Sequence, residues 1–369
     1  MHGFAKHAQS VLDSPFNVFA DSCTGAQDFD RVEKRDYLIE RFGGIKPLRR
    51  LAKARRITQA VKAGDVKAVF ADSWKSVEFL TPDLNVPVIC FAHGNEFPQD
   101  GYERAQAGIS LKRFGSLKRK KDRISKAFKS VSRVIPVSTA TRERVQTYFP
   151  REKAVHLIHP PIEALPDIGK AEREAADGFW PASGTRLLCL SRLIAWKGVD
   201  MSLKTMAYLR DQNIEAQLVI AGDGPQSGDL KRLAEQLGIS RNVAFIGRIE
   251  GAKKFALMQS ADIFMQPGRK IGDQSEGFGI TYLEAGLAGL AAISGKAGGA
   301  MDAVQHGVTG LCVDGTDLTS IQEATISLIM DRDLRRRLSK AAKQRAEQSL
   351  WSRKIFEITR LIDEGGVHG

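Results

Sequence analysis

The most constraining feature of the sequence is a repeated alternation between short apolar runs and longer amphipathic stretches. The runs are rich in Val and Ile and the stretches are long enough for helices, which is typical of parallel βαβ construction. An α/β fold is therefore predicted. We expect strands near Phe16–Ala20, Lys67–Ala71, Pro87–Phe91, Arg133–Val137, Ala154–Ile158, Arg186–Leu190, Gln217–Ala221, Val243–Ile246, Ile263–Gln266, Ala291–Ser294 and Gly310–Val313.

The length of the chain allows two domains. It has 369 residues with 43% hydrophobic content, enough for two separate cores. Residues 160–184 contain four prolines and many charges, which predicts a linker followed by a surface excursion. We place a first domain at 1–162 and a second at 163–349, and we expect a C-terminal helix over 350–369 to pack back on the first. Two doubly wound Rossmann-like domains facing a cleft bind ligands at the carboxyl ends of their strands.

The beginning of the chain departs from this pattern. Residues 3–14 resemble a glycine turn that feeds a helix, with Gly3 in the turn. A parallel domain of this type normally begins with a strand before that turn, and this strand lies centrally in the sheet. Its absence would leave unpaired backbone in a core. Either the start is misplaced or the N-terminal sheet differs from this pattern; we favour a missing segment and so expect an N-terminal domain that lacks its first strand.

Cysteine usage and hydropathy indicate a soluble, cytoplasmic protein. The four cysteines show no CxxC spacing and three lie in apolar, strand-like runs (Cys23, Cys90, Cys189 and Cys312). They are predicted to be reduced core residues, not a disulfide frame or a metal site. The start of the chain does not resemble a signal peptide, and the longest weakly polar run, Ala285–Ser294, is too short to span a bilayer.

The net charge of +12 is unevenly distributed. Residues 41–62 carry eight Lys or Arg and no acid, and residues 112–133 carry ten with one acid, Asp122. Such a face attracts nucleic acid, anionic lipid or an anionic substrate, although either block alone could be a solvated helix face. Nucleic acid is disfavoured because Phe128 is the only aromatic residue in the basic stretch Leu117–Lys129 and no nucleic-acid motif appears. We expect an anionic membrane surface as the partner, with the protein peripheral on it.

Two glutamates bracket a glycine-bearing segment, Glu276-Gly277-Phe278-Gly279-Ile280-Thr281-Tyr282-Leu283-Glu284. The glycines let backbone amides approach a ligand, and a helix starting at about Ile280 directs unpaired N–H groups at it. Glu284 then lies one turn into the helix and can accept hydrogen bonds from a diol. This arrangement suits a nucleotide-sugar diphosphate. An acidic turn that complements the helix dipole explains the segment alone equally well.

Four further segments lie in the second half in a fixed order. The first carries Arg192 and Lys197 between a strand and a helix, where two cations can hold a diphosphate. The second is a tight strand-to-helix turn at Gly222, a weak match to a dinucleotide fingerprint. The third is a strand end at 245–249 whose backbone could face a base. The fourth runs through residues 298–304 and 306–310.

This order resembles the family 4 retaining glycosyltransferases of the GT-B fold. Residues 261–269 and 158–163 look like the bacterial phosphatidylinositol mannosyltransferase branch. The resemblance implies that Arg192 and Lys197 bind the donor's diphosphate, that Glu284 binds the ribose and that Glu276 contacts the transferred sugar. The resemblance also implies that Ile249 lies against the base and that the backbone amides of Phe278, Gly279 and Ile280 lie near the sugar and diphosphate. Gly277 and Gly222 are included among the donor-binding residues.

In the first half, Phe91-Ala92-His93-Gly94 matches the family's strand-end histidine, which lies beside the reacting sugar. Gly3 falls where a donor-phosphate loop would close. Taken alone, His93 is more often a packed or capped strand-end histidine and Lys197 a solvated helix-start lysine. The tripeptide Asp28-Phe29-Asp30 mimics a metal-binding DxD motif, but it lies in a charged loop of the first half, so we expect no metal site.

The predicted function is transfer of a hexose from a nucleotide sugar to a lipid-linked or glycan acceptor in cell-surface polysaccharide or glycolipid synthesis. Mannose from GDP-mannose is favoured, with retention, no metal and no other cofactor. The predicted catalytic residues are His93, Arg192, Lys197 and Glu276. A UDP-sugar-dependent enzyme and a non-catalytic nucleotide-sugar-binding partner of a glycan-assembly complex are the alternatives. A dinucleotide oxidoreductase is disfavoured because its fingerprint is lacking.

Overall fold

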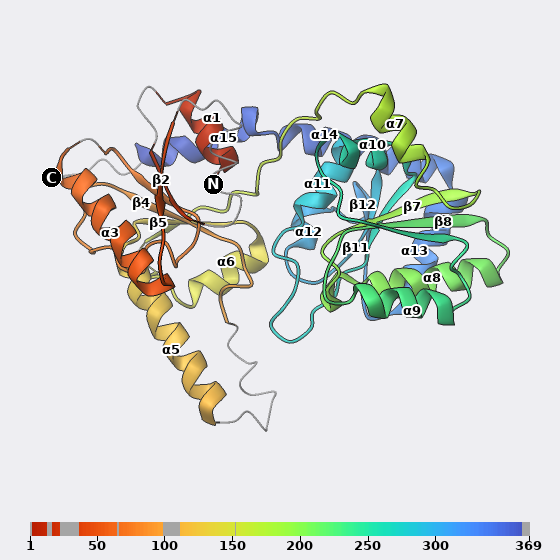
Figure 1. Ribbon diagram of the computed structural model, residues 1–369, viewed down its shortest axis with the longest axis horizontal. Helices are drawn as coiled ribbons and strands as arrows, with labels where there is room; N and C mark the ends of the chain where they lie inside the picture. The colour runs from red at the N-terminus through yellow and green to blue at the C-terminus, as the bar shows by residue number, and fades with distance from the viewer. Residues whose placement is uncertain are drawn as a thin grey trace. The chain divides into compact units, whose positions relative to one another are not determined.

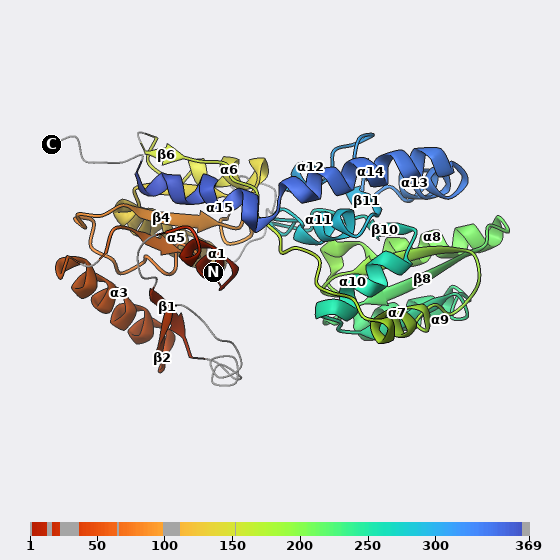
Figure 2. The ribbon, with the colours of Figure 1, turned by 90° about the horizontal axis from the view of Figure 1, so that it is seen from above.

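The computed structural model describes residues 2–12, 17–22, 37–64, 66–98, 111–151 and 153–363 (Figures 1 and 2). Cys23 and the tripeptide Asp28-Phe29-Asp30 lie outside these ranges. The chain divides into two compact units. Unit 1 comprises Met1–Pro161 and Trp351–Gly369, and unit 2 comprises Ile162–Leu350.

Unit 2 contains a six-stranded parallel sheet in the order β12-β11-β10-β7-β8-β9. All six strands predicted for the second half are confirmed, and their ends shift by at most one residue. Their bounds are β7 Thr185–Leu190, β8 Ala216–Ala221, β9 Val243–Gly247, β10 Ile263–Gln266, β11 Ala291–Gly295 and β12 Gly310–Val313. The strands read as apolar runs because both faces of this sheet are covered.

Helices cover both faces of this sheet (Figure 1). On one face lie α8 Val199–Asp211, α9 Ser227–Gln236 and α13 Leu318–Met330. On the other lie α10 Gly251–Ser260, α11 Ile280–Leu287 and α14 Arg332–Gln348, with α12 Ala300–Ala303 beside β11. The apolar positions of α8 recur at helical spacing and are buried, which is why this segment forms an amphipathic helix against the sheet.

The predicted linker at 160–184 is only partly irregular. It contains the helix α7 Lys170–Asp177, which packs on α10 and buries Ala176. Trp180 Nε1 donates to Ser260 Oγ at 2.9 Å. The prolines lie outside the helix, so counting them over the whole segment concealed a short helix that is stabilised by tertiary packing.

Unit 1 contains a four-stranded parallel sheet in the order β3-β4-β5-β6, and a separate parallel pair, β1-β2. The bounds are β1 Asn17–Asp21, β2 Leu38–Phe42, β3 Val69–Ala71, β4 Val88–Ala92, β5 Arg133–Pro136 and β6 Ala154–Val155. The sequence prediction missed β2. Its residues are not fully buried and include two charged side chains, so it lacks the apolar run of a central strand.

Alternate residues of β4 face two different cores. Val88, Cys90 and Ala92 pack in a core with α3 Lys46–Lys62, α5 Leu111–Ala127 and α6 Thr139–Gln146. Ile89 and Phe91 pack on the opposite face with α1 His2–Gln9 and α15 Trp351–Thr359. Figures 1 and 2 show α1 beside α15, and Trp351 stacks on His7 with ring centroids 5.4 Å apart.

The amino-terminal end differs from the prediction in one respect. Gly3 lies in the first turn of α1, so the expected glycine turn before the helix is wrong. The described strands of unit 1 form two separate sheets, β1-β2 and β3-β4-β5-β6, and the expected lack of a first strand stays a prediction. No helix in the described part of the chain is long and apolar enough to cross a bilayer.

Candidate functional site

The strand order of the unit 2 sheet reverses between β7 and β10. From β7 the chain continues to β8 and β9 on one side, whereas β10 is followed by β11 and β12 on the other. Ligands of doubly wound sheets bind at the carboxyl ends of the strands at such a switch point. Arg192 and Lys197 follow β7, and Glu276 follows β10, so three predicted site residues lie on the two loops that border it.

Lys197 and Glu276 form an ion pair across this switch point. Lys197 Nζ lies 2.6 Å from Glu276 Oε2, and each side chain is 12% exposed. Gln266 Nε2, at the end of β10, donates to the same oxygen at 3.2 Å. No donor of the described chain reaches Glu276 Oε1. One carboxylate oxygen is therefore held by the protein, and the other can accept a hydrogen bond from a ligand.

The turn from Glu276 to α11 is held by backbone contacts. The Gly299 amide donates to the Glu276 carbonyl at 2.8 Å. Gly279 caps α11 with φ +94°, and a Cβ there would lie 2.4 Å from the ring of Tyr282. The Tyr282 hydroxyl donates to the Gln266 carbonyl at 2.7 Å. The predicted helix start at Ile280 is confirmed, and its first amides have no intrahelical acceptor.

Glu284 also has a lysine partner. Lys254 Nζ, on α10, lies 2.7 Å from Glu284 Oε1, and the two side chains are 19% and 18% exposed. Lys254 was missed by the sequence analysis because a lysine within a helical segment has no motif around it. The two glutamates that opened the functional interpretation are therefore each bound by a lysine from another loop or helix.

The other predicted donor contacts lie on neighbouring strand ends. Arg192 is exposed and has no side-chain partner in the described chain. The backbone of Gly222 lies against the Ser191 carbonyl, and its amide donates to the Gly247 carbonyl at 2.7 Å. Gly222 therefore contacts the loops that follow β7 and β9 through its backbone. Ile249 is half-buried just after β9, whereas Phe278 is buried and Ile280 exposed.

Several buried polar atoms near these strand ends have no hydrogen-bond partner in the described chain. They are Ser191 Oγ, Trp196 Nε1, Gln266 Oε1 and Thr281 Oγ1. Each unsatisfied buried polar group costs about 1–3 kcal/mol, so it requires an explanation. Their residues lie on the same two loops and the helix start that carry Lys197 and Glu276, which is where a polar ligand is expected.

His93 lies in unit 1, immediately after β4. Its Nε2 is 2.9 Å from the Asp72 carbonyl, and its amide donates to Glu96 Oε1 at 3.0 Å. Partial burial lowers the pKa of His93 below its ordinary value. Burial also raises the pKa of Glu96 to about 7. The Asp72 carbonyl accepts from Nε2–H and orients the imidazole, and burial favours the neutral ring, whose Nδ1 can then accept a hydrogen bond.

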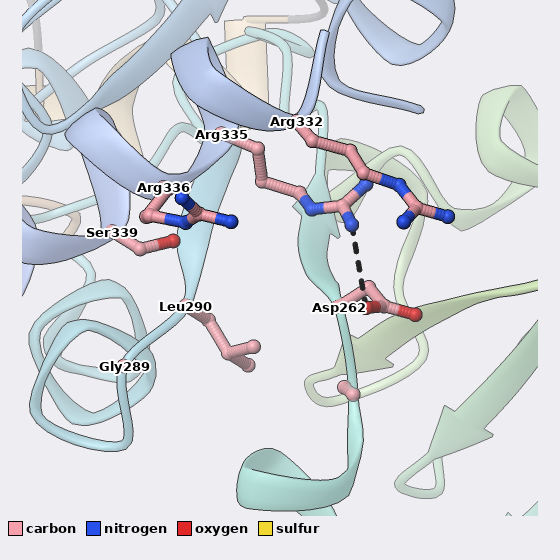
Figure 3. Close-up of a pocket in the computed structure, with 8 residues that line it drawn as sticks. Asp262, Gly289, Leu290, Arg332, Arg335, Arg336 and Ser339 are labelled. Atoms are coloured by element: carbon pink, nitrogen blue, oxygen red, sulfur yellow. Dashed lines mark ion pairs between the residues drawn. The ribbon is translucent and has the colours of Figure 1, made fainter. Parts of the chain in front are cut away.

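A pocket elsewhere in unit 2 contains none of the predicted site residues. Its volume is about 510 Å³. Figure 3 shows Arg332, Arg335 and Arg336 of α14 among its lining residues, with Asp262 and Leu290. Arg335 pairs with Asp262 at 3.6 Å. Asp262 and Leu290 immediately precede β10 and β11, so this pocket lies at the amino end of the strands. The residues predicted to bind the donor's diphosphate and sugar follow β7 and β10, at the carboxyl end.

Comparison with known proteins follows the same division of the chain. Residues 15–164 match the family described as Glycosyltransferase Family 4, and residues 171–345 match Glycosyl transferases group 1.

A GDP-mannose-dependent alpha-(1-6)-phosphatidylinositol monomannoside mannosyltransferase of Mycolicibacterium smegmatis is 28% identical over 332 residues, covering 87% of this chain and 82% of the relative. A GDP-mannose-dependent monoacylated alpha-(1-6)-phosphatidylinositol monomannoside mannosyltransferase of Corynebacterium glutamicum is 35% identical over 232 residues, which is 58% of each chain.

Among solved structures, sucrose-phosphate synthase from Thermosynechococcus elongatus superposes with a TM-score of 0.74 and 18% identity, covering 98% of this chain and 91% of that one. This likeness concerns the fold alone. With matches to glycosyltransferase families along nearly its whole length, the chain belongs to the family 4 glycosyltransferases of the GT-B fold.

Proposed function

We propose that this glycosyltransferase moves mannose from GDP-mannose to a lipid-linked or glycan acceptor, with retention of configuration and without a metal ion. The observation that carries the proposal is the Lys197–Glu276 ion pair at the switch point of unit 2, beside the start of α11. The similarity to GDP-mannose-dependent mannosyltransferases favours this donor. Cell-surface polysaccharide or glycolipid synthesis is the proposed setting.

The ion pair suggests how the donor is recognised. A diphosphate offers Lys197 a second anionic partner, and Arg192 is exposed and can fork two phosphate oxygens. Glu276 then accepts sugar hydroxyls on Oε1 while Gln266 still holds Oε2. Lys254 and Glu284 are paired on the ribose side of the proposed site. On donor binding, Lys197 gains the diphosphate as a partner and Glu276 gains the sugar hydroxyls, so neither charged side chain is left buried without a partner.

The chemistry rests on stabilising the departing nucleoside diphosphate. Its negative charge grows as the glycosidic bond breaks, and Arg192, Lys197 and the amino end of α11 supply positive potential for it. This set of groups is the basis for proposing a metal-independent reaction. His93 is proposed to lie beside the reacting sugar and to hydrogen-bond it as a neutral imidazole.

Retention is proposed to occur by front-face attack, in which a donor phosphate oxygen takes the acceptor's proton. A double displacement requires a carboxylate nucleophile. Glu276 accepts hydrogen bonds from an ammonium and an amide on one oxygen, which stabilises the anion and lowers its nucleophilicity. The geometry therefore favours Glu276 as a residue that orients the sugar.

The proposed acceptor surface is the basic part of unit 1, placed against an anionic membrane. Part of the first basic block has an internal role, because Lys53 pairs with Asp21 and Arg50 with Glu78. The exposed basic side chains of α3, α5 and the turn after α5 that form no ion pair in the described chain are Lys46, Arg55, Lys62, Lys118, Arg119, Lys126 and Lys129. Ile45 and Leu48 at the start of α3 are 67% and 62% exposed. Each basic residue near an anionic surface contributes about 1 kcal/mol.

The donor is tested by thermal shift and transfer assays with GDP-mannose, UDP-glucose and ADP-glucose. A ligand at 100 times its Kd stabilises by about 2.7 kcal/mol, so the preferred donor should give the largest shift. Transfer of mannose to a phosphatidylinositol-containing vesicle is the expected activity. Selective stabilisation and turnover with a UDP-sugar would replace the proposed donor, and donor binding without transfer to any acceptor would favour a binding partner.

The membrane proposal is tested by co-sedimentation with neutral and anionic vesicles. Stronger binding to anionic vesicles that weakens with salt is expected. The variant Lys118→Glu/Arg119→Glu should lose this preference, whereas Lys204→Glu, an exposed lysine of α8 in unit 2, should keep it. Equal binding of the unaltered protein to both vesicle types would contradict the proposal.

A further inference from the structure

The loop after β10 carries a second charged group that the donor site does not use. Arg269 and Asp200 form a two-pronged ion pair, with Nη1–Oδ1 and Nη2–Oδ2 distances of 2.9 Å each. Their side chains are only 17% and 25% exposed. Paired guanidinium–carboxylate forks of this kind set geometry as well as energy. Asp200 lies in the first turn of α8, three residues after Lys197.

The same loop contacts the chain on both sides of Lys197. The Arg269 amide donates to the Trp196 carbonyl at 2.9 Å. On the other side, Gly198 has φ +77°, and a Cβ there would lie 2.1 Å from the Pro267 carbonyl oxygen. The loop backbone therefore touches residues 196 and 198, and the Arg269 side chain grips residue 200. Lys197 lies between these three points of attachment.

From these contacts on both sides of Lys197 we propose that Arg269 and Asp200 are positioning residues. They hold the turn that carries Lys197 so that its ammonium can bind the donor's second phosphate. The inference rests on the proposed donor site, and it adds a residue to which no motif assigns a role. Arg269 acts through Lys197, because the Nη1–Nη2 edge of its guanidinium binds Asp200 and its side chain is only 17% exposed. When the Arg269–Asp200 ion pair is removed, the turn that carries Lys197 can change its conformation, and the diphosphate then loses a preorganised partner.

The experiment compares GDP with GMP, which share base and ribose and differ by the second phosphate. Calorimetric Kd values are measured for both nucleotides with the unaltered protein, Arg269→Gln, Asp200→Asn, Lys197→Ala and Arg269→Gln/Lys197→Ala. For Arg269→Gln and Asp200→Asn we expect GDP to bind about tenfold more weakly, the size of one charge-assisted hydrogen bond. GMP should change by less than about twofold. The double variant should bind GDP no more weakly than Lys197→Ala.

A merely structural ion pair gives a different result. The control Arg335→Gln removes another arginine that is 18% exposed, which pairs with Asp262 and donates to the Leu328 carbonyl at the amino end of the sheet. It should lower the Tm and leave the GDP-to-GMP ratio unchanged. If Arg269→Gln does not fold, Arg269→Lys keeps the charge without the fork and should still lose part of the GDP preference.

The outcomes separate the two levels of the proposal. If Lys197→Ala lowers the GDP-to-GMP preference and Arg269→Gln does not, the positioning role is overturned and the donor site stands. Multiplicative losses in the double variant, or equal weakening of GDP and GMP by Arg269→Gln, also overturn it. If Lys197→Ala itself leaves the preference unchanged, the diphosphate assignment fails and the positioning role fails with it.

Discussion

The strand ends of unit 2 and unit 1 are organised differently. In unit 2, Lys197, Gln266 and Glu276 form a connected polar cluster that is largely buried and held from several loops. In unit 1, His93 follows β4 and keeps part of its surface exposed, with the Asp72 carbonyl and the Glu96 carboxylate as its partners. A largely buried cluster requires every partner to be placed, whereas an exposed residue tolerates variation. Donor binding suits the first arrangement.

The cations of the two units also differ in what they pair with. In unit 2, Lys197 and Lys254 are bound to the two glutamates proposed to contact the donor. In unit 1, Arg50 and Arg123 bind Glu78, which is 8% exposed and is none of the predicted site residues. A basic sequence block can therefore be structural in part. Substitutions that separate paired from exposed charges test this comparison directly.

The largest effect is expected from Lys197→Ala. It removes a cation from the developing diphosphate charge and leaves Glu276 with only the Gln266 amide as a partner, so turnover should fall by about 10²–10³-fold. Lys204 is an exposed lysine of α8, the helix that follows Lys197, and Lys204→Ala should keep near-normal turnover. Steady-state transfer rates measure both. Normal turnover in Lys197→Ala would remove the assignment.

The next effect concerns the two ends of α11. Gly279 and Gly289 have nearly equal φ values of +94° and +95°, but a Cβ at Gly279 meets the Tyr282 ring and one at Gly289 meets nothing within 4 Å. Gly289→Ala should cost about 1–2 kcal/mol of unfolding free energy from backbone strain alone. Gly279→Ala should cost more and also lower turnover. Equal stability losses, measured by denaturant unfolding, would mean that Tyr282 yields without disturbing the site.

A smaller effect is expected from Lys254→Ala. Without the ammonium, Glu284 is a partly buried carboxylate beside an anionic donor, so the donor KM should rise about tenfold with little change in kcat. The adjacent Lys253 is exposed, and Lys253→Ala should leave both constants unchanged. An unaltered KM in Lys254→Ala would show that the Lys254–Glu284 pair lies outside the donor contact.

The smallest effect concerns Glu96 in unit 1. Its pKa is raised from 4.5 to about 7, mainly by burial. The folded state therefore keeps a proton that the unfolded state has lost, and stability falls as pH rises through this window. Relative to Glu96→Gln, the unaltered protein should lose unfolding free energy between about pH 4.5 and pH 7 and change little outside that range. Parallel pH profiles of the two proteins would show that Glu96 has an ordinary pKa.

The sequence by itself determined the α/β class, the strands of unit 2 and the order of the residues proposed to bind the donor. These follow from local periodicity, since an apolar run bounded by turns predicts a buried strand wherever it occurs. The start of α11 at Ile280 was also predictable, because a glycine before a helical stretch is a local signal. The strand β2 and the helix α7 escaped prediction because packing with distant segments stabilises them, and their own patterns are weak.

Only the tertiary structure decided which side chains meet. Lys197 and Glu276 are 79 positions apart in the chain and Lys254 and Glu284 are 30 apart, so no spacing rule connects them. The same holds for Arg269 and Asp200, separated by 69 positions. Parallel strands place the ends of distant segments at one edge of the sheet, and short-range sequence patterns do not record those long-range contacts. The residues could be named from the sequence, but their pairing could not.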